Sequence, residues 1–342
     1  MKVVSFGEVM MRLIPPGFLR FNQAKSFDVF YAGAEANVAV ALANLGIPVD
    51  FVTCLPENEL GDACINYLRQ FGVGVNKIIR THDRLGIYFV ETGAVHRGNK
   101  VIYDRENSAF ANIKSNLINW TEVFSNARWF HWSGITPAVS KNAAEVCLEA
   151  VKKAKEIGLT ISCDLNYRGK LWKWEKTPEK IMSELIKYVD VLICNEEDAE
   201  KIFGIKAPNV DVEKGKIDAN RYSFVVEKLK DRFPNIKYIA ITLRQSIGAS
   251  HNKWSGILYD GKKLYIGPNY DITHIVDRVG AGDAFAAGLI YMLLQKSDSQ
   301  KALDFAVAIS CLKHTIYGDS CVIKLEEVEK LMKGVTSGRI SR

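Results

Sequence analysis

The feature that most constrains the fold of this 342-residue chain is a regular alternation of short apolar runs with amphipathic helical periods. The apolar runs are Val3–Phe6, Asp50–Cys54, Trp129–Trp132, Thr160–Asp164, Val189–Cys194 and Tyr238–Leu243. A helical period lies between two of these runs, at Ala143–Ile157. This alternation predicts βαβ units, and therefore an α/β fold in three layers with a mostly parallel central sheet. Ligands in such folds bind beyond the carboxyl ends of the strands, so the residues that follow each run are the first site candidates.

The composition excludes several classes of protein. Apolar residues make up 48% of the chain and charged residues 25%, as in an ordinary globular protein. The longest nearly unbroken apolar run, Ala284–Leu294, covers 11 residues, which is short of the ~20 that a membrane span needs. The net charge is +6 and the basic residues are spread along the chain. This pattern argues against a nucleic acid as the main partner, although it suits an anionic substrate.

The seven cysteines are scattered singly, without a C-x-x-C pair. They are Cys54, Cys64, Cys147, Cys163, Cys194, Cys311 and Cys321. An odd number of isolated cysteines, several of them in strand-like runs, predicts buried and reduced thiols. The chain also begins with the strand-like run Val3–Phe6 instead of a signal-peptide pattern. We therefore expect a cytoplasmic protein.

Two segments interrupt the alternation. Segment 11–31 contains Pro15-Pro16-Gly17 and no helical period, while segment 86–105 contains two β-rich runs, Ile87–Glu91 and Lys100–Arg105. Together the two segments predict a small accessory sheet, inserted in the main domain, that acts as a lid over the strand ends. The alternative is a pair of separate surface hairpins.

The strongest chemical signal is the segment Asp277–Asp283, with the sequence DRVGAGD, which precedes a long apolar helix. Gly280 and Gly282 let the backbone turn sharply, so that unpaired N–H groups around Ala281 converge on one point. These donors and the positive end of the helix would stabilise an anion such as a transferring phosphoryl group. Asp283 follows in the first helical turn, where a carboxylate is placed to accept the proton of an attacking hydroxyl.

The same segment is also compatible with an ordinary capped helix start, because Asp is common in first helical turns. It is not a Walker A motif, since no Gly-Lys-Ser/Thr follows the glycines. It is not a dinucleotide fingerprint either, since it lies near the C-terminus without a following acidic strand end. The two glycines on either side of Ala281 favour the anion site.

A second glycine-led helix start spans Tyr31–Gly46 and is rich in small residues. Gly33 and Ala34 would let the backbone approach a ligand closely. Asn37 carries both a donor and an acceptor for hydroxyl groups. The alternative is a buried helix whose small residues serve packing alone.

The two glycine-led segments together resemble the signatures of the PfkB (ribokinase-like) family of sugar kinases. The N-terminal signature of that family has a Gly-Gly or Gly-Ala pair followed by Asn, as in Gly33-Ala34 and Asn37, and its C-terminal signature matches Asp277–Asp283 without a gap. The resemblance covers essentially the whole chain and implies one ribokinase-like kinase domain over residues 1–342. It also implies ATP as the phosphoryl donor, Asp283 as general base and Gly280–Gly282 as anion hole. The lid often mediates dimers in this family, so a homo-oligomer is expected.

Within the family, the chain is similar to the members that convert the sugar acid 2-dehydro-3-deoxy-D-gluconate to its 6-phosphate. The residues behind this similarity are Tyr88, Tyr103-Asp104-Arg105, Asp164-Leu165-Asn166-Tyr167-Arg168 and Gly318-Asp319. The resemblance implies that Tyr88, Tyr103 and Arg105 reach the substrate from the lid. It places Arg168 at a strand end and Asp319 in the C-terminal loop, both at the sugar. Guanidinium groups bind carboxylates through paired hydrogen bonds, whereas the alternative for each arginine is a surface salt bridge.

The nucleotide side matches the family less closely. The candidates there are Asn166, Arg168, Lys170, Asn195, Thr242, Arg244, Gly248, Gly280 and Gly282. Arg244 stands where many family members have glycine, so we expect it to lie against a phosphate, with Gly248 closing the same loop. Lys170 is equally compatible with a phosphate contact and with a solvated lysine.

A metal site is implied by the segment Cys194–Asp198, which resembles the Asn-x-x-Glu motif that helps to organise Mg²⁺ and phosphate. Asp198 replaces the glutamate of that motif. Because a hard cation accepts carboxylate oxygen, also through water, we expect Asn195 and Asp198 to organise Mg²⁺. The alternative is an acidic helix N-terminus without a metal.

Two other functions remain open at this point. One is a fructokinase or another neutral-sugar kinase, although such an enzyme has no need of two arginines at the sugar. The other is a non-catalytic sugar- or nucleotide-binding regulator, which has no use for the base Asp283.

Overall fold

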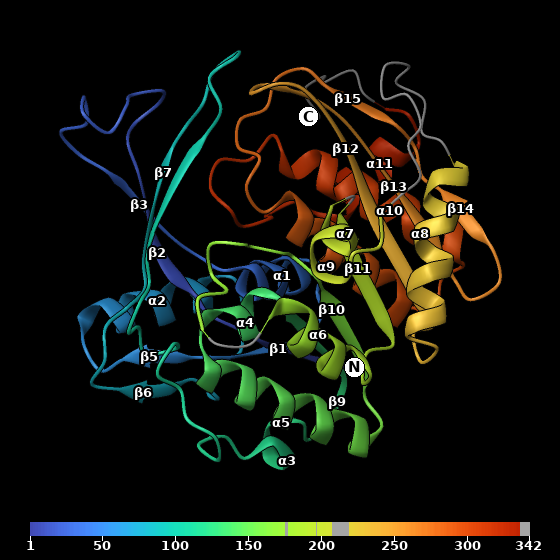
Figure 1. Cartoon of the computed structure of the whole chain (residues 1–342). Coiled ribbons are helices and arrows are strands. Elements are labelled where there is room, and N and C mark those ends of the chain that lie inside the picture. The colour runs from blue at the N-terminus through green and yellow to red at the C-terminus, as the bar shows by residue number, and fades with distance from the viewer. Residues whose placement is uncertain (175–176, 196, 207–218, 336–342) are drawn as a thin grey trace.

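The structure is a computed structural model that describes residues 1–174, 177–195, 197–206 and 219–335. Its centre is a nine-stranded sheet between two layers of helices (Figure 1). In spatial order the strands are β14 (Leu264–Ile266), β13 (His251–Tyr259), β12 (Tyr238–Gly248), β11 (Val191–Asn195), β10 (Thr160–Asp164), β9 (Ala127–Ser133), β1 (Lys2–Phe6) and β4 (Val49–Val52), with β15 (Tyr270–Ile272) paired to β13.

The middle of this sheet is parallel. Every pairing from β4 through β1, β9, β10 and β11 to β12 is parallel, and the pairings of β13 are antiparallel. The carboxyl ends of the parallel strands therefore meet at one edge of the sheet, where ligands bind in open α/β sheets.

Helices cover both faces of the main sheet. They are α1 (Ala34–Asn44), α2 (Glu59–Gln70), α3 (Trp120–Val123), α4 (Ile135–Val139), α5 (Lys141–Ile157), α6 (Pro178–Ile186), α7 (Asp198–Phe203), α8 (Ala219–Arg232), α9 (Ala281–Leu294), α10 (Ser299–Lys313) and α11 (Leu325–Met332). Adjacent strand residues point to opposite faces, so Val3 packs in the apolar core with α1, α9 and α10, whereas Val4 packs with α3, α5 and α6.

Four strands form a separate accessory sheet beside the carboxyl ends of the main strands (Figure 1). They are β2 (Met10–Ile14), β3 (Asp28–Ala32), β7 (Ile87–Glu91) and β8 (Lys100–Asp104), in the order β3-β2-β7-β8. Parallel pairing of β2 with β7 joins the two inserted segments into one sheet instead of two separate hairpins. A two-stranded sheet of β5 (Cys54–Pro56) and β6 (Ile79–Thr81) completes the strands described.

The predicted α/β fold, with a mostly parallel sheet and a small second sheet, is confirmed. One predicted run, Asp50–Cys54, proves to be two strands, because the chain leaves β1 after Val52 and pairs with β6 from Cys54. All seven cysteines are free, and all but Cys311 are buried, as expected. Among the described residues, no helix is long and apolar enough to cross a membrane.

Helix α9 carries the glycine motif at its start and must pack closely on α10. Gly288 lies at this contact, and a Cβ added there would be 2.6 Å from Ile309 Cγ2 and 3.1 Å from Ala306 Cα. The apolar helix is buried on nearly all sides, so its start is held in a fixed place beside the strand ends.

We predict that Gly288→Ala destabilises the protein. The steric cost of overpacking, about 1–3 kcal/mol, exceeds the ~1 kcal/mol that alanine gains over glycine in a helix. The measurement is the midpoint of thermal unfolding. The control is Gly98→Ala, since no atom lies within 4 Å of a Cβ added at Gly98. A midpoint for Gly288→Ala at or above that of the wild type would contradict the close packing of α9 on α10.

Candidate active site

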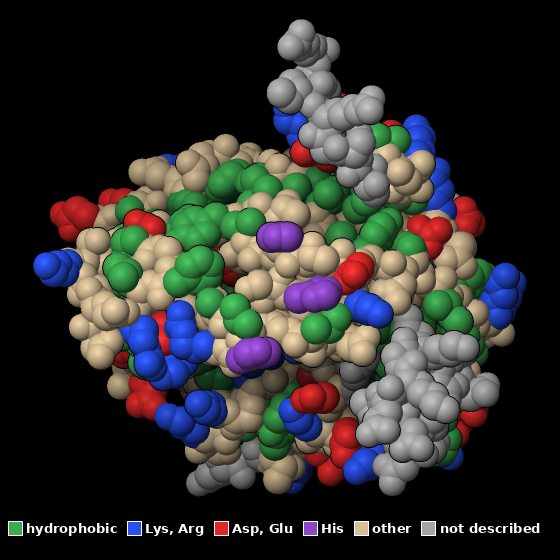
Figure 2. Space-filling view, turned by 90° about the horizontal axis from the view of Figure 1, so that it is seen from above, with side chains coloured by type: hydrophobic (Ala, Val, Ile, Leu, Met, Phe, Trp, Pro, Cys, Tyr) green, Lys and Arg blue, Asp and Glu red, His purple; other side chains and the backbone are tan. Residues whose placement is uncertain are grey.

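A cavity of about 740 Å³ lies at the carboxyl ends of the main strands and is covered on one side by the accessory sheet. The predicted residues that line it are Gly33, Ala34, Asn37, Tyr88, Tyr103, Arg105, Asn166, Arg168, Asn195, Asp198, Thr242, Arg244, Gly280, Ala281, Gly282, Asp283 and Asp319. Seen from above, Lys and Arg side chains gather beside a hollow in the surface (Figure 2), which suits the approach of anionic ligands.

The start of α9 forms part of the cavity wall. Gly280 is the N-cap residue and has φ +84°, a conformation that favours glycine. It offers no side-chain cap, so the N–H groups of Ala281, Gly282 and Asp283 have no partner among the described residues. A Cβ added at Gly282 would meet no atom within 4 Å, so the chain is open to the cavity there. Unpaired donors at a helix N-terminus bind anions well.

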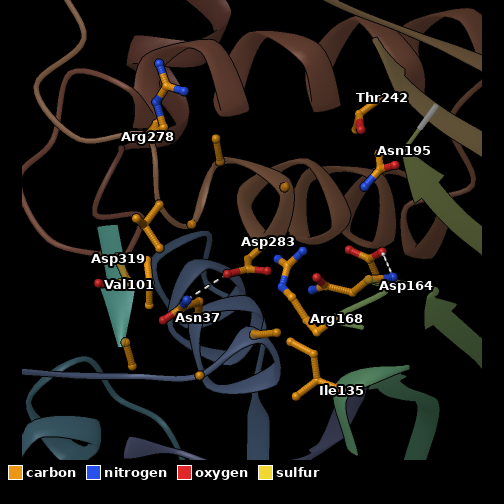
Figure 3. A pocket seen from close by; sticks show the side chains of 18 of the residues that line it. Asn37, Val101, Ile135, Asp164, Arg168, Asn195, Thr242, Arg278, Asp283 and Asp319 are labelled. Atoms are coloured by element: carbon orange, nitrogen blue, oxygen red, sulfur yellow. Dashed lines mark hydrogen bonds between the residues drawn. The ribbon is translucent and has the colours of Figure 1, made fainter. Parts of the chain in front are cut away.

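Asp283 points into the cavity beside these donors (Figure 3). Its Oδ2 accepts a hydrogen bond of 2.7 Å from Asn37 Nδ2 at the start of α1. Desolvation by the surrounding protein raises the pKa of Asp283 to about 7, and the charges of Asp319 and Glu35 act in the same direction. The hydrogen bond from Asn37 and the charge of Arg168 oppose this rise. A carboxylate with a pKa near neutrality is suited to take up a proton during catalysis.

Glu35 fixes the start of α1 on the main sheet. This buried carboxylate accepts hydrogen bonds from Ser133 N, Ser133 Oγ and Thr136 Oγ1, at 3.0, 2.7 and 2.8 Å. A Cβ added at Gly7 would lie 2.1 Å from Glu35 Oε2. Glu35 therefore holds α1, and with it Asn37, at a defined position relative to Asp283.

Two further carboxylates lie at the ends of β10 and β11. Asp198 accepts backbone hydrogen bonds from Asn195 N and Tyr167 N, at 2.9 and 3.1 Å, and thereby ties the two strand ends together. Burial raises the pKa of Asp198 and raises that of Asp164 well above its ordinary value. The side chain of Arg168 lies between Asp164 and Asp283 (Figure 3). The positive charge of Arg168 partly offsets the rise in pKa that desolvation causes at Asp164, Asp198 and Asp283.

Two arginines line the part of the cavity next to β12, Arg244 and Arg278. Arg278 Nη2 donates to the carbonyl oxygens of Gly248 and Ala249, at 3.1 and 2.7 Å. Burial lowers the pKa of Arg278, and the charge of Arg244 acts in the same direction. An anion bound between the two guanidinium groups would relieve their mutual repulsion.

The opposite part of the cavity is formed by the accessory sheet. The ring of Tyr88 stacks on that of Tyr103, with centroids 5.8 Å apart. Arg105 donates through Nε and Nη2 to the buried carboxylate of Glu8, while its Nη1 has no partner among the described residues. Asp319 is also buried, where it accepts a hydrogen bond of 2.7 Å from the Tyr88 hydroxyl.

The structure gives some predicted residues a different setting. Lys170 is exposed and Gly248 is an acceptor for Arg278, and neither lines the cavity. A Cβ added at Gly33 would lie 1.9 Å from the carbonyl oxygen of Glu8, so this glycine is needed by the packing of the chain on itself. Asn195 Oδ1 accepts from the N–H groups of Glu197 and Asp198 at the start of α7.

Comparison with known proteins identifies the family. The profile of the pfkB family carbohydrate kinases matches residues 1–321. The chain belongs to this family. The fold and the family predicted from the two glycine-led segments are thereby confirmed, and the protein is a carbohydrate kinase.

Several proteins align with this chain over nearly the whole of both sequences. A 2-dehydro-3-deoxygluconokinase from Thermotoga maritima, known from a crystal structure, is 48% identical with a TM-score of 0.92, over 98% of this chain and 100% of that one. A 2-dehydro-3-deoxygalactonokinase from Haloferax volcanii is 32% identical over 98% of both chains. Fructokinase-1 from Oryza sativa is 29% identical over 97% of both chains.

Sequence reasoning missed several residues of this kinase site. Glu8, Asp164 and Arg278 line the cavity, although none was assigned a role there. Glu8 and Asp164 were open to prediction, because Glu8 follows β1 and Asp164 is the last residue of β10. Arg278 lies inside the glycine motif, yet nothing in the sequence indicates which way its side chain turns. Among the described residues, no group of three or more His, Cys, Asp or Glu could hold a metal ion by itself.

We predict that Asp283→Asn stabilises the folded kinase more at pH 8 than at pH 5. An unfolded Asp has a pKa of about 3.9, whereas in the folded protein the pKa is about 7. The folded state therefore binds the proton more tightly, and stability falls as the pH rises from about 4 to 7. Asn has no charge to desolvate and escapes this loss.

The measurement is the thermal midpoint of both proteins at the two pH values. Asp231→Asn is the control, since this side chain is exposed and lies outside the cavity. Equal gains at both pH values for Asp283→Asn would show that the carboxyl is not desolvated.

Proposed function

We propose that this carbohydrate kinase transfers the γ-phosphoryl group of ATP to a hydroxyl of an acidic sugar, namely 2-dehydro-3-deoxy-D-gluconate, and forms its 6-phosphate. The observation that carries the proposal is the position of Asp283, beside the unpaired N–H groups of α9 in a cavity lined by arginines. The 48% identical 2-dehydro-3-deoxygluconokinase supports the choice of substrate.

Asp283 acts as the general base in this proposal. It accepts the proton of the sugar hydroxyl while the hydroxyl oxygen forms a bond to the γ-phosphorus and the bond to the ADP oxygen breaks. The N–H groups of Ala281 and Gly282 stabilise the charge on the moving phosphoryl group. The hydrogen bond from Asn37 holds the carboxylate in the orientation that leaves one oxygen for the hydroxyl.

The phosphates of ATP would lie between the start of α9 and the arginines next to β12. The donors there fit an anion, since Arg278 Nε is buried without a partner among the described residues. Mg²⁺, when bound, neutralises phosphate charge. Asn195 and Asp198 would help to hold it through their side-chain oxygens, and the Asp198 carboxylate is held in place by the backbone N–H groups of Tyr167 and Asn195.

The accessory sheet would supply the sugar side and serve as the lid. The carboxylate of the substrate would bind Arg168, whose guanidinium donates to no carboxylate among the described residues, and the Nη1 of Arg105. Glu8 holds Arg105 toward the cavity. The flat rings of Tyr88 and Tyr103 suit the carbon chain of the sugar.

A homo-oligomer formed through this sheet is part of the proposal. The whole of β8 is exposed, and apolar side chains project from the sheet and its loops, with Ile102 54% and Phe18 60% exposed. Exposed apolar side chains of this kind mark contact surfaces. The fitting partner is a second copy of this chain.

A second candidate substrate is the galacto epimer, because a 32% identical relative is a 2-dehydro-3-deoxygalactonokinase. The two sugar acids share the carboxylate and differ at one hydroxyl. Fructose is the third candidate, although it offers no carboxylate to the arginines.

The first test is ADP release from ATP with each of the two sugar acids, with fructose and without sugar. We expect turnover with the sugar acids, and a reduction by about 10²–10⁴ in Asp283→Asn with binding of ATP retained. Near-normal turnover of this variant would show that Asp283 is not the general base. A preference for fructose would contradict the proposal that the substrate is an acidic sugar. Binding of sugar and ATP without release of ADP would indicate a non-catalytic regulator.

The second test is Arg105→Gln. Loss of a charge-assisted hydrogen bond is expected to raise KM for the sugar acid about 10- to 100-fold, with KM for ATP unchanged. Arg128→Gln is the matched control, since Arg128 lies exposed at the start of β9 outside the cavity. An equal rise of KM for ATP and for the sugar would contradict a place at the substrate carboxylate.

A further inference from the structure

Arg12 is a buried arginine of the accessory sheet that does not line the cavity. It contacts two aspartates that pack around the turn at Gly280. Its side chain is 1% exposed. Nη2 donates to Asp277 Oδ2 at 2.7 Å and Nη1 donates to Asp319 Oδ2. A fully buried arginine is unusual unless it is paired, and this one is paired twice.

Both partners of Arg12 shape the turn at the start of α9. Asp277 accepts a hydrogen bond of 3.0 Å from Val279 N through its other oxygen. The carbonyl oxygen of Asp319 lies 2.0 Å from the place of a Cβ on Gly280, so its backbone packs directly on the turn. Movement of either acid would therefore displace the N–H groups that follow Gly280.

The accessory sheet holds these acids from two neighbouring strands. Arg12 reaches them from β2, while the Tyr88 hydroxyl donates to Asp319 Oδ1 from β7. Tyr88 also lines the cavity. The contacts thus connect the sheet that covers the sugar side with the turn that carries the anion donors.

The same pairing sets the charge beside Asp283. The negative charge of Asp319 raises the pKa of Asp283, and the guanidinium of Arg12 compensates that charge. The other charged or polar groups that act on Asp283 are Glu35, Asn37, Asp164 and Arg168. Lys313 adds a buried positive charge near Asp277, where its Nζ donates to the Asp277 carbonyl oxygen at 3.3 Å.

We propose that Arg12 is a positioning residue for phosphoryl transfer, which fixes the Gly280 turn against the accessory sheet and neutralises Asp319 beside the base. The proposal rests on the role proposed above for Asp283. The sheet and the anion donors then keep one relative position, so that a hydroxyl bound under the sheet meets the phosphoryl group in line. Removing the guanidinium would loosen the turn and leave two buried carboxylates with less compensation.

The test uses the wild type, Arg12→Met, Arg12→Lys and the double variant Arg12→Met/Asp319→Asn. Arg84→Met is the matched control, because Arg84 pairs with Asp104 of the same sheet at the surface, and neither residue lines the cavity. For each protein, kcat, both KM values, the pH profile of kcat and the thermal midpoint are measured with the sugar acid on which the wild type acts.

We expect Arg12→Met to lower kcat about 100-fold, as misplacement of reacting groups by about 1 Å does, with KM for ATP nearly unchanged. The acidic limb of its pH profile should move to higher pH, since the uncompensated Asp319 charge disfavours ionised Asp283. Arg12→Lys keeps the positive charge but loses the guanidinium's pair of hydrogen-bond donors. The acidic limb of its pH profile should therefore stay at the wild-type pH, whereas kcat should still fall.

The double variant removes the negative charge of Asp319 together with the positive charge of Arg12, so it should fold. The acidic limb of its pH profile should return toward the wild-type pH, whereas kcat should stay low. If Arg12→Met fails to fold, the kcat values and pH profiles of Arg12→Lys and of the double variant test the proposal. Wild-type kcat and pH profile in folded variants, with only the thermal midpoint lowered, would reduce Arg12 to a structural role and overturn the proposal. Absence of turnover in the wild type and Arg84→Met would instead refute the proposed function.

Discussion

The desolvation of carboxylates at the strand ends is the constraint on which the rest of the site depends. Asp283, Asp164 and Asp198 lie close together in the wall of the cavity, and desolvation by the surrounding protein raises their pKa values. Such a group of acids destabilises the fold at neutral pH unless donors and cations surround it. The placement of Asn37 and Arg168 around them follows from this need. Uptake of a proton by one of these acids would also lower the electrostatic cost of placing them together.

Each donor near these acids is itself held by another buried contact. Asn37 depends on Glu35, which fixes the start of α1. Arg105 depends on Glu8, and the turn at Gly280 depends on the backbone of Asp319. Buried pairs of this kind add little net stability, but loss of one partner is costly. These buried pairs therefore serve mainly to hold the site in one geometry, and they contribute little to the stability of the fold.

The fold and the centre of the site could be predicted from the sequence because local patterns determine them. Apolar periodicity indicates where strands and helices lie, and the glycines around Ala281 indicate an open helix start. The long-range pairs could not be predicted. Arg12 and Asp319 are separated by 307 residues, and Glu8 and Arg105 by 97. No local pattern reveals that such charges meet, so the sequence left Arg105 either at the substrate or in a surface salt bridge, whereas two of its nitrogens pair with the buried Glu8.

This partial occupation bears on how an acidic sugar would be distinguished from a neutral one. An arginine without a carboxylate partner would attract any anion, including the phosphates of ATP. Because Glu8 accepts from two of its nitrogens, the Arg105–Glu8 pair carries little net charge, and Nη1 of Arg105 remains for a hydrogen bond. A substrate carboxylate then forms a charge-assisted hydrogen bond at Arg105 and an ion pair with Arg168, whereas a neutral sugar offers these arginines only uncharged hydroxyl groups. Discrimination would therefore arise from the two arginines acting together, with Glu8 limiting the attraction of phosphate to Arg105.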